Sequence, residues 1–326
     1  MNDTSKLITN FFTNYMIGER GFSNNTVKSY RDTFVLYFNF LIENKINLFK
    51  DNNLFTQIYV LDFLKHLEDS GSSISTINQR LAAIKSFCNY AIRYKPESFN
   101  EIIQIKQLKP KKNIENKIDY LTKDEVKLLI ESIDTKKEIK DLAIISLLYE
   151  SGARVQELID LKVNDLFLGT PSTIILHGKG RKIRKIPIND RCKKILYEYI
   201  KKYKIDDYLF INNSHNKYTR TGISYIISKY VDRAREKDKL LFRIKVHPHV
   251  LRHSKAMHML ENGVNLIYIR DFLGHSSVTT TEIYAKCNPE LKRKHLETVT
   301  LKIESNINNN IVDSKDELIE WLRQNI

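Results

Sequence analysis

The stretch that decides the fold is Thr173-Ile-Ile-Leu-His-Gly-Lys-Gly-Arg-Lys-Ile-Arg-Lys-Ile-Pro-Ile188, in which two β-rich runs flank Gly178-Lys179-Gly180. Such runs around a glycine-containing turn predict a β-hairpin. Elsewhere, apolar residues recur mainly at the three- and four-residue spacing of amphipathic helices. The sequence therefore predicts a mainly α-helical protein with a small antiparallel β-sheet in one mixed α+β domain.

The chain of 326 residues is long enough for two domains, each with its own core. Residues 1–105 are expected to form a bundle of four or five helices, with Ser23 and Ser75 as N-caps and the aromatic residues in the core. Residues 106–117 contain a proline and adjacent lysines but little apolar periodicity, so we expect a linker there.

The second domain is expected at 118–300, and it opens with a capping box formed by Thr122 and Glu125. Further helices are expected at 141–150, 155–161, 190–202, 221–237, 250–262, 266–273, 279–286 and 289–298. The tail, 301–326, contains a polar spacer and then a short apolar helix. Because a helix of about twelve residues is marginal alone in water, we expect this one to dock on its own domain or on another subunit.

The chain is strongly basic, since Lys and Arg exceed Asp and Glu by 14 and the pI is near 9.4. Residues 111–300 hold 37 of the 53 basic and 24 of the 39 acidic residues, whereas the rest is close to balance. A polyanion is the partner that this charge favours, with nucleic acid first. Ordinary solvated lysines are the alternative reading of the same composition.

The three cysteines are far apart and outside any C-x-x-C spacing, so neither a disulfide framework nor a zinc site is indicated. No window approaches the 18 or so apolar residues of a membrane span. We expect a cytoplasmic protein with no membrane partner, no cofactor and no metal.

Cationic and hydrogen-bonding residues in distinctive local settings gather in the second domain. They are Arg154, Lys179, His249, Arg252, His275 and Tyr284. Metals favour carboxylates and thiolates, which this set does not contain. Guanidinium groups match phosphate oxygens in a bidentate manner, so the set suits a phosphodiester.

The sequence around each candidate residue indicates the role that it can have in the site. Arg154 begins a helix after Gly152, and Glu157 lies on the same helix face, either as an ion-pair partner or as a support. Lys179 sits at the hairpin tip, where it can protonate a leaving alkoxide or simply meet a phosphate. Tyr284 is placed two turns into the helix that follows His275.

The segment His247-Pro-His-Val-Leu-Arg-His-Ser254 is more specific. Proline fixes the helix start, and His249 and Arg252 then share one face of the first turn, where the helix dipole also favours an anion. We interpret His247 and His253 as structural.

The segments that contain these candidate residues together resemble the tyrosine recombinase family, the phage integrase and Xer group, over about 120–298. The matching segments are SGARVQELIDL, HGKGRKIRKIPI, HPHVLRHSKAMHMLENGVNL and FLGHSSVTTTEIYA. The resemblance implies a helical core-binding domain at 1–105 and a catalytic domain at 118–300 that together clamp duplex DNA. It also implies tetramers, of this chain alone or together with a related recombinase, that exchange strands at a specific site through a Holliday junction.

The resemblance also implies a role for each residue. Arg154 and Arg252 hold the phosphate oxygens, His249 assists proton removal and His275 donates a further hydrogen bond. Tyr284 attacks phosphorus, Lys179 protonates the leaving 5′-oxygen, and Glu157 is a support. A type IB topoisomerase-like DNA-relaxing enzyme and a non-catalytic DNA-binding regulator are the alternatives. The first would act without a defined site, and the second has no need of Tyr284 or Lys179.

Overall fold

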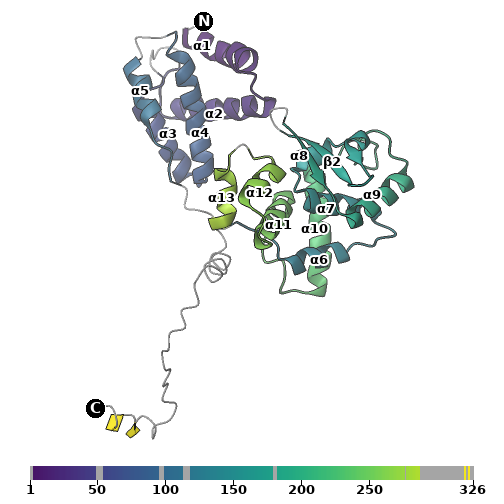
Figure 1. Ribbon diagram of the computed structural model, residues 1–326. Coiled ribbons are helices and arrows are strands. Elements are labelled where there is room, and N and C mark those ends of the chain that lie inside the picture. Colours follow the sequence, from purple (N-terminus) through teal and green to yellow (C-terminus); the bar gives the residue numbers. More distant parts are fainter. Residues whose placement is uncertain are drawn as a thin grey trace. The chain divides into compact units, whose positions relative to one another are not determined.

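The computed structural model describes residues 3–48, 54–94, 99–112, 118–178, 182–275, 277–286, 319–320 and 322–323. The chain divides into two compact units, Met1–Asn116 and Lys117–Ile326 (Figure 1). The expected class, mainly helical with a small antiparallel sheet, is confirmed. The expected helix at 289–298 and most of the tail at 301–326 lie outside the described residues.

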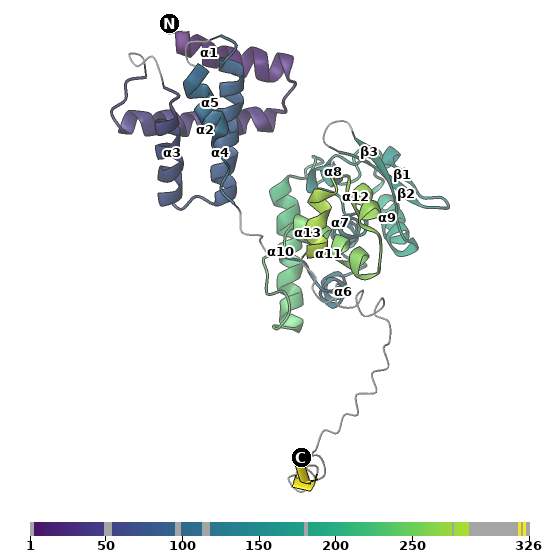
Figure 2. The ribbon, with the colours of Figure 1, turned by 60° about the vertical axis from the view of Figure 1, so that its left-hand side comes forward.

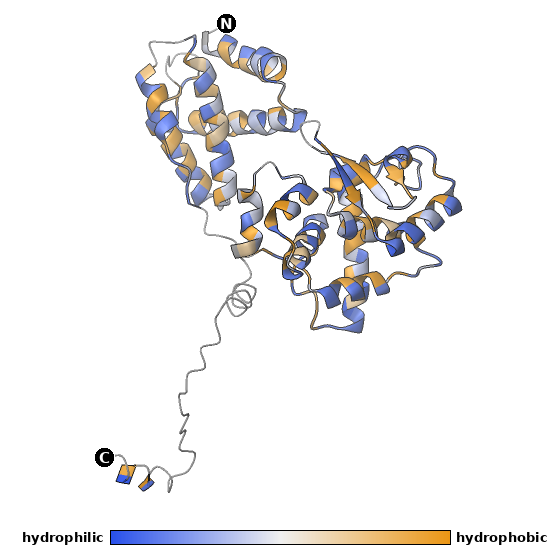
Figure 3. Ribbon diagram, viewed as in Figure 1, coloured by the Kyte–Doolittle hydropathy of each residue, from blue (hydrophilic) through white to orange (hydrophobic). Residues whose placement is uncertain are grey.

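The N-terminal unit is helical throughout its described part. Its elements are α1 (Asp3–Asn10), the π-helical η1 (Phe11–Glu19), α2 (Asn24–Glu43), α3 (Gln57–Asp69), α4 (Ile74–Ala91) and α5 (Phe99–Gln107). Phe87 lies at the centre of the core, with its ring centroid 5.3 Å from those of Phe11 and Phe34 and 4.6 Å from that of Phe55. All four side chains are buried, which confirms the predicted place of Phe11, Phe34 and Phe87 in the core. In Figure 3, polar and apolar residues both occur along these helices, as amphipathic helices require.

One of the two predicted N-caps is correct. Ser23 caps α2 and accepts a hydrogen bond from the Thr26 amide. The prediction of Ser75 is wrong, because Ser73 accepts from the Thr76 amide and α4 begins at Ile74. Ser75 lies inside α4, whereas Ser73 precedes it and can accept from an amide of the first turn that has no partner within the helix.

Part of the segment expected to be a linker packs on the N-terminal unit. Lys106 and Gln107 end α5. Asn78 then binds the backbone of Lys111 twice, since its amide donates to the carbonyl at 2.9 Å and its oxygen accepts from the N–H at 2.8 Å. The amide side chain replaces a missing backbone partner, which holds the chain to α4 as far as Lys111. Residues 113–117 lie outside the described residues.

The C-terminal unit is mixed. Its elements are α6 (Lys123–Glu131), α7 (Ile139–Ser151), α8 (Val155–Ile159), η3 (Val163–Asp165), β1 (Leu166–Phe167), β2 (Thr173–His177), β3 (Ile183–Pro187), α9 (Asp190–Tyr203), α10 (Arg220–Lys237), α11 (Pro248–Glu261), α12 (Leu266–Leu273) and α13 (Thr279–Lys286). The predicted helices between 141 and 286 agree with these bounds within two residues at each end. The predicted capping box of Thr122 and Glu125 is present.

The sheet is antiparallel, in the order β1-β2-β3. The predicted hairpin is β2 and β3, paired with Ile174 opposite Ile186 and Leu176 opposite Arg184. Ile174, Leu176 and Ile186 are buried, so one face of the hairpin belongs to the core. The two-residue strand β1 was not predicted, because so short a run carries no alternation to detect.

The core of this unit centres on α7, which is buried along most of its length. A helix that is apolar nearly all round must be covered on several sides, and α7 contacts α6, α8, α9 and α11. The helices α11, α12 and α13 contact one another and lie together in both views (Figures 1 and 2). No helix among the described residues is long and apolar enough to cross a membrane.

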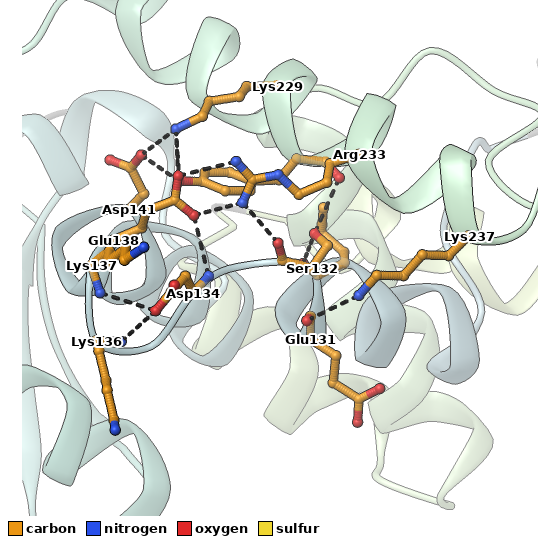
Figure 4. Close-up of polar contacts among 12 residues, drawn as sticks. Glu131, Ser132, Asp134, Lys136, Lys137, Glu138, Asp141, Lys229, Arg233 and Lys237 are labelled. Atoms are coloured by element: carbon orange, nitrogen blue, oxygen red, sulfur yellow. Dashed lines mark hydrogen bonds and ion pairs between the residues drawn. The ribbon is translucent and has the colours of Figure 1, made fainter.

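A polar network fixes α10 against the loop before α7 (Figure 4). Arg233 forms a bidentate ion pair with Glu138, at 2.6 and 3.1 Å, and also donates to the Ser132 carbonyl. Lys229 binds the same carboxylate at 3.0 Å. Hydrogen bonds from Arg233 lower the pKa of Glu138 to about 2. The carboxylate is therefore ionised throughout the physiological range.

We expect Arg233→Met to lower the free energy of unfolding by about 1–3 kcal/mol, the usual cost of losing hydrogen bonds to a charged group. Urea unfolding of the full chain at pH 7 measures this change. Arg31→Met is the control, because Arg31 forms an ion pair with its exposed neighbour Asp32 and should change stability little. Equal stability of the two variants would contradict the importance of the network.

Candidate active site

Arg154 lies where α7 ends and α8 begins. The helix α7 stops at Gly152, whose φ of +55° favours glycine and whose Cβ, if it had one, would meet Phe272 at 2.9 Å. Arg154 then precedes α8, and Glu157 accepts from both its backbone amide at 2.8 Å and its Nη1 at 2.9 Å. The predicted pairing of Arg154 with Glu157 is therefore present, and the carboxylate fixes both the helix start and the guanidinium.

Arg252, on the second turn of α11, is only 3% exposed. Its guanidinium donates to the Gly152 carbonyl at 2.5 Å and to the Leu273 carbonyl at 2.6 Å. These carbonyls lie at the C-terminal ends of α7 and α12, where helix dipoles favour a cation. Burial, together with the nearby Arg154 and Arg184, lowers the pKa of Arg252 to about 9. The group stays largely cationic at neutral pH in a place that favours an added anion.

The catalytic candidates His249 and His275 are both held neutral at pH 7. The His249 side chain is exposed, yet the surrounding protein, His247 and Arg252 lower its pKa. His275 follows α12, and its Nδ1 lies 3.0 Å from the hydroxyl of the buried Thr281. Burial, Arg252 and Arg154 lower the pKa of His275 to about 4. An anion near these cations would oppose both shifts.

Tyr284, on α13, is 1% exposed. Its hydroxyl lies 2.9 Å from Nδ1 of His253. Burial raises the pKa of Tyr284 to about 12, although Arg252 and Arg154 act in the opposite direction. Burial and the charges of His249 and Arg252 lower the pKa of His253 to about 4. The neutral imidazole, in the tautomer with its proton on Nε2, accepts a hydrogen bond from the hydroxyl.

The contact of His253 with Tyr284 was not predicted, and the interpretation of His253 as structural stays a prediction. Residues four apart lie on the same face of a helix, so His253 shares a face of α11 with His249. The two imidazole rings are indeed 6.5 Å apart. The i, i+4 spacing was the available signal, although no sequence pattern shows which residue of α13 meets the ring.

Arg184 is a second residue that the sequence reading missed. It lies on β3, its side chain is 11% exposed, and it forms a bidentate ion pair with Glu157 at 2.9 and 2.6 Å. Its Nε donates to the Phe272 carbonyl at 3.0 Å. Burial alone would raise the pKa of Glu157, but Arg184 and then Arg154 outweigh it and lower that pKa.

A cavity of about 450 Å³ opens beside these groups. It is lined by Arg154, Gly178, Lys182, Ile183, Arg184, Asp271, Gly274 and His275. The Gly178 amide donates to the Lys182 carbonyl at 2.7 Å, which closes the base of the hairpin loop. Lys179, the candidate acid, lies in this loop outside the described residues. No group of three or more His, Cys, Asp or Glu side chains among the described residues could hold a metal ion.

Of the predicted residues, Arg154, Glu157, Arg252, His275 and Tyr284 therefore meet around one place, joined by Arg184 and His253. The guanidinium groups can bind two oxygens of a phosphodiester, and the tyrosine can act as nucleophile. A two-unit helical fold with this site defines the class of the tyrosine recombinases.

The chain belongs to the phage integrase family. The model of the phage integrase family matches residues 119–290, and that of the phage integrase N-terminal SAM-like domain matches 9–95. The tyrosine recombinase XerD of Oceanobacillus iheyensis is 34% identical over 84% of this chain and 91% of its own. The tyrosine recombinase XerC of Staphylococcus haemolyticus is 29% identical over 87% of this chain and 93% of its own.

Solved structures share the fold. The XerH site-specific recombinase bound to a palindromic difH substrate matches with a TM-score of 0.69 at 20% identity, over 83% of this chain and 78% of its own. The Tn1549 transposon integrase in complex with a circular intermediate DNA matches with a TM-score of 0.69 at 17% identity, over 90% of this chain and 99% of its own.

The lowered histidine pKa values predict how stability depends on pH. His253, His258 and His275 each have a folded pKa of about 4, against 6.5 for a free imidazole. Between these two pKa values the unfolded chain binds more protons than the folded chain. The contribution of these histidines to the free energy of unfolding should therefore be complete above pH 6.5 and should decrease as the pH is lowered toward 4. Urea unfolding at pH 7, 6 and 5 measures the slope above the range of most carboxylates.

His275→Gln is the informative variant, because glutamine keeps hydrogen-bonding groups but does not titrate. It should make the slope between pH 7 and pH 5 shallower. A stability that does not change over this range would contradict the neutral state of these histidines.

Proposed function

We propose that this protein is a site-specific DNA recombinase that cleaves and rejoins strands through a phosphotyrosine bond to Tyr284. The observation that carries the proposal is the arrangement of two guanidinium groups and a tyrosine: Arg252 on α11 donates to the carbonyl of Gly152, two residues before Arg154, and the next residue on α11, His253, lies 2.9 Å from Oη of Tyr284. The same charges stabilise the negative charge that develops when this oxygen attacks phosphorus.

In the proposed first step, Oη of Tyr284 attacks the scissile phosphorus while His249 assists removal of the hydroxyl proton. The bond from phosphorus to the 5′-oxygen breaks, and Lys179 gives that oxygen a proton. The phosphorane has one more negative charge than the diester, and Arg154, Arg252 and His275 bind its oxygens more strongly than those of the ground state. A 5′-hydroxyl from another strand reverses the step, so the phosphotyrosine bond supplies the energy of rejoining.

Access to Tyr284 requires a change on DNA binding. At 1% exposure, its hydroxyl cannot reach a phosphorus atom while α13 is packed as described. The partner of the proposed reaction is duplex DNA with a defined site, held by both units, in the cytoplasm. Exchange of two strand pairs through a Holliday junction requires four active sites, so the proposed assembly is a homotetramer, with a mixed tetramer that includes a related recombinase as the alternative.

Covalent capture tests the proposal. DNA that stays attached to the protein after denaturation in cells should be enriched for one sequence, and Tyr284→Phe should remove the attachment while DNA binding is retained, because only the attacking oxygen is lost. Sequencing of the attached DNA and gel-shift binding of the recovered sequence give the two readouts. Attached DNA with no preferred sequence would favour a topoisomerase-like activity, and attachment by the Phe variant would exclude Tyr284 as the nucleophile.

Deletion of 305–326 tests the proposed assembly. The spacer and apolar helix of this tail are proposed to dock on a neighbouring protomer, so the truncated chain should bind a single site with unchanged affinity. It should form fewer multimeric complexes on DNA, measured by light scattering, and should recombine more slowly. A truncated chain with full recombination activity would contradict this role.

A further inference from the structure

Glu157 is shared by two guanidinium groups. Its side chain is 4% exposed, and its two oxygens accept four hydrogen bonds. Arg154 supplies one from its backbone amide and one from Nη1, at 2.8 and 2.9 Å. Arg184 supplies the other two from Nη1 and Nη2, at 2.9 and 2.6 Å. One negative charge therefore faces two positive charges.

The two arginines are not equivalent. Arg184 is 11% exposed, and each of its three nitrogens donates to the protein: Nη1 and Nη2 to Glu157, and Nε to the Phe272 carbonyl at 3.0 Å. Both arginines line the cavity, but Arg154 is 34% exposed, and its Nη2 makes only a long contact of 3.3 Å with the Gly274 carbonyl. Arg184 therefore donates mainly to protein acceptors, whereas Arg154 has N–H donors available for a ligand.

The number of charges around Glu157 determines how strongly Arg154 attracts an anion. A buried carboxylate paired with one guanidinium forms a neutral pair, in which the guanidinium attracts a further anion weakly. When Arg184 is added, the cluster of three groups carries a net positive charge. Glu157 can then orient Arg154 without cancelling its attraction for a phosphate.

We propose that Arg184 is a positioning residue that neutralises Glu157, so that Arg154 is held in place and keeps its positive charge for the scissile phosphate. The proposal rests on the proposed function, in which Arg154 binds that phosphate. Arg184 acts through Glu157 and is not assigned a contact with DNA.

Arg184 also links the hairpin to the segment that carries His275. It stands on β3 opposite Leu176, and its bond to Phe272 reaches the last turn of α12. Gly274 has a φ of +65°, and a Cβ there would lie 3.1 Å from Nη1 of Arg184. The backbone before His275 therefore packs directly against this guanidinium, which fixes both sides of the cavity.

The test uses the purified full chain and a duplex that contains the sequence recovered by covalent capture. Two quantities are measured for each variant: the rate of covalent adduct formation at saturating duplex, and the dissociation constant of the duplex. Arg184→Met should slow adduct formation by about 100-fold or more, the usual effect of losing one preorganised charge-stabilising group. The dissociation constant should change by less than about threefold, because most DNA contacts are elsewhere.

Removal of the carboxylate should rescue this loss. In the double variant Glu157→Gln with Arg184→Met, Arg154 no longer faces an unbalanced negative charge, so we expect adduct formation about tenfold faster than in Arg184→Met alone. A purely structural role predicts the opposite, since the double variant loses more native contacts. Arg184→Lys, which keeps the charge without the bidentate geometry, should lie between the wild type and Arg184→Met.

Arg233→Met is the matched control. Arg233 also forms a bidentate ion pair, with Glu138, although this pair is more exposed than that of Arg184 with Glu157, and the network labelled in Figure 4 includes none of the active-site residues. Its loss should lower stability and leave the rate of adduct formation within about twofold. If wild type forms no adduct, the proposed function fails. If wild type reacts and Arg184→Met reacts equally fast, or the double variant is no faster than Arg184→Met, the role of Arg184 is overturned.

Discussion

The rest of the site depends on the Arg252 guanidinium, which bridges the C-terminal ends of two helices. Its bonds to the carbonyls of Gly152 and Leu273 hold the end of α7 and the end of α12 on either side of α11. Arg154 follows the first of these ends and His275 follows the second. A single buried cation therefore sets the spacing between the groups proposed to surround the phosphate.

This arrangement places like charges close together in the absence of a ligand. Arg154 and Arg184 share the carboxylate of Glu157, whereas Arg252 donates to two main-chain carbonyls, and the lowered pKa of Arg252 reflects burial and repulsion from the other two guanidinium groups. The helix-end carbonyls and Glu157 stabilise the three guanidinium groups, but the cluster that they form keeps a net positive charge. A phosphodiester, and still more a phosphorane, supplies the missing negative charge. The same charges that disfavour the empty site thus favour the reaction proposed for it.

Local sequence signals predicted most of the fold. Apolar periodicity gave the helices of the C-terminal unit, and the Thr122–Glu125 box marked the start of α6. Cap selection was harder, because Ser73 and Ser75 both fit the pattern and only the backbone geometry decides between them. The attachment of Lys111 to Asn78 depends on a contact between residues 33 apart, which periodicity does not report.

The candidate site was predictable where a residue's role follows from its own segment. The pairing of Arg154 with Glu157 follows from i, i+3 spacing, and the place of Tyr284 follows from the helix after His275. Arg184 is one of several cations after the hairpin tip, and strand alternation puts it on the same face as the buried Ile186. That alternation marks it as inward-facing, but its pairing with Glu157 comes from the packing of β3 against α8, which only the three-dimensional structure provides.

The central claim is that Tyr284 carries the DNA strand. Mass spectrometry of the covalent adduct, after nuclease and protease digestion, identifies the modified residue directly. We expect a nucleotide joined through phosphate to the peptide that contains Tyr284. A nucleotide on any other residue, with Tyr284 unmodified, would contradict it.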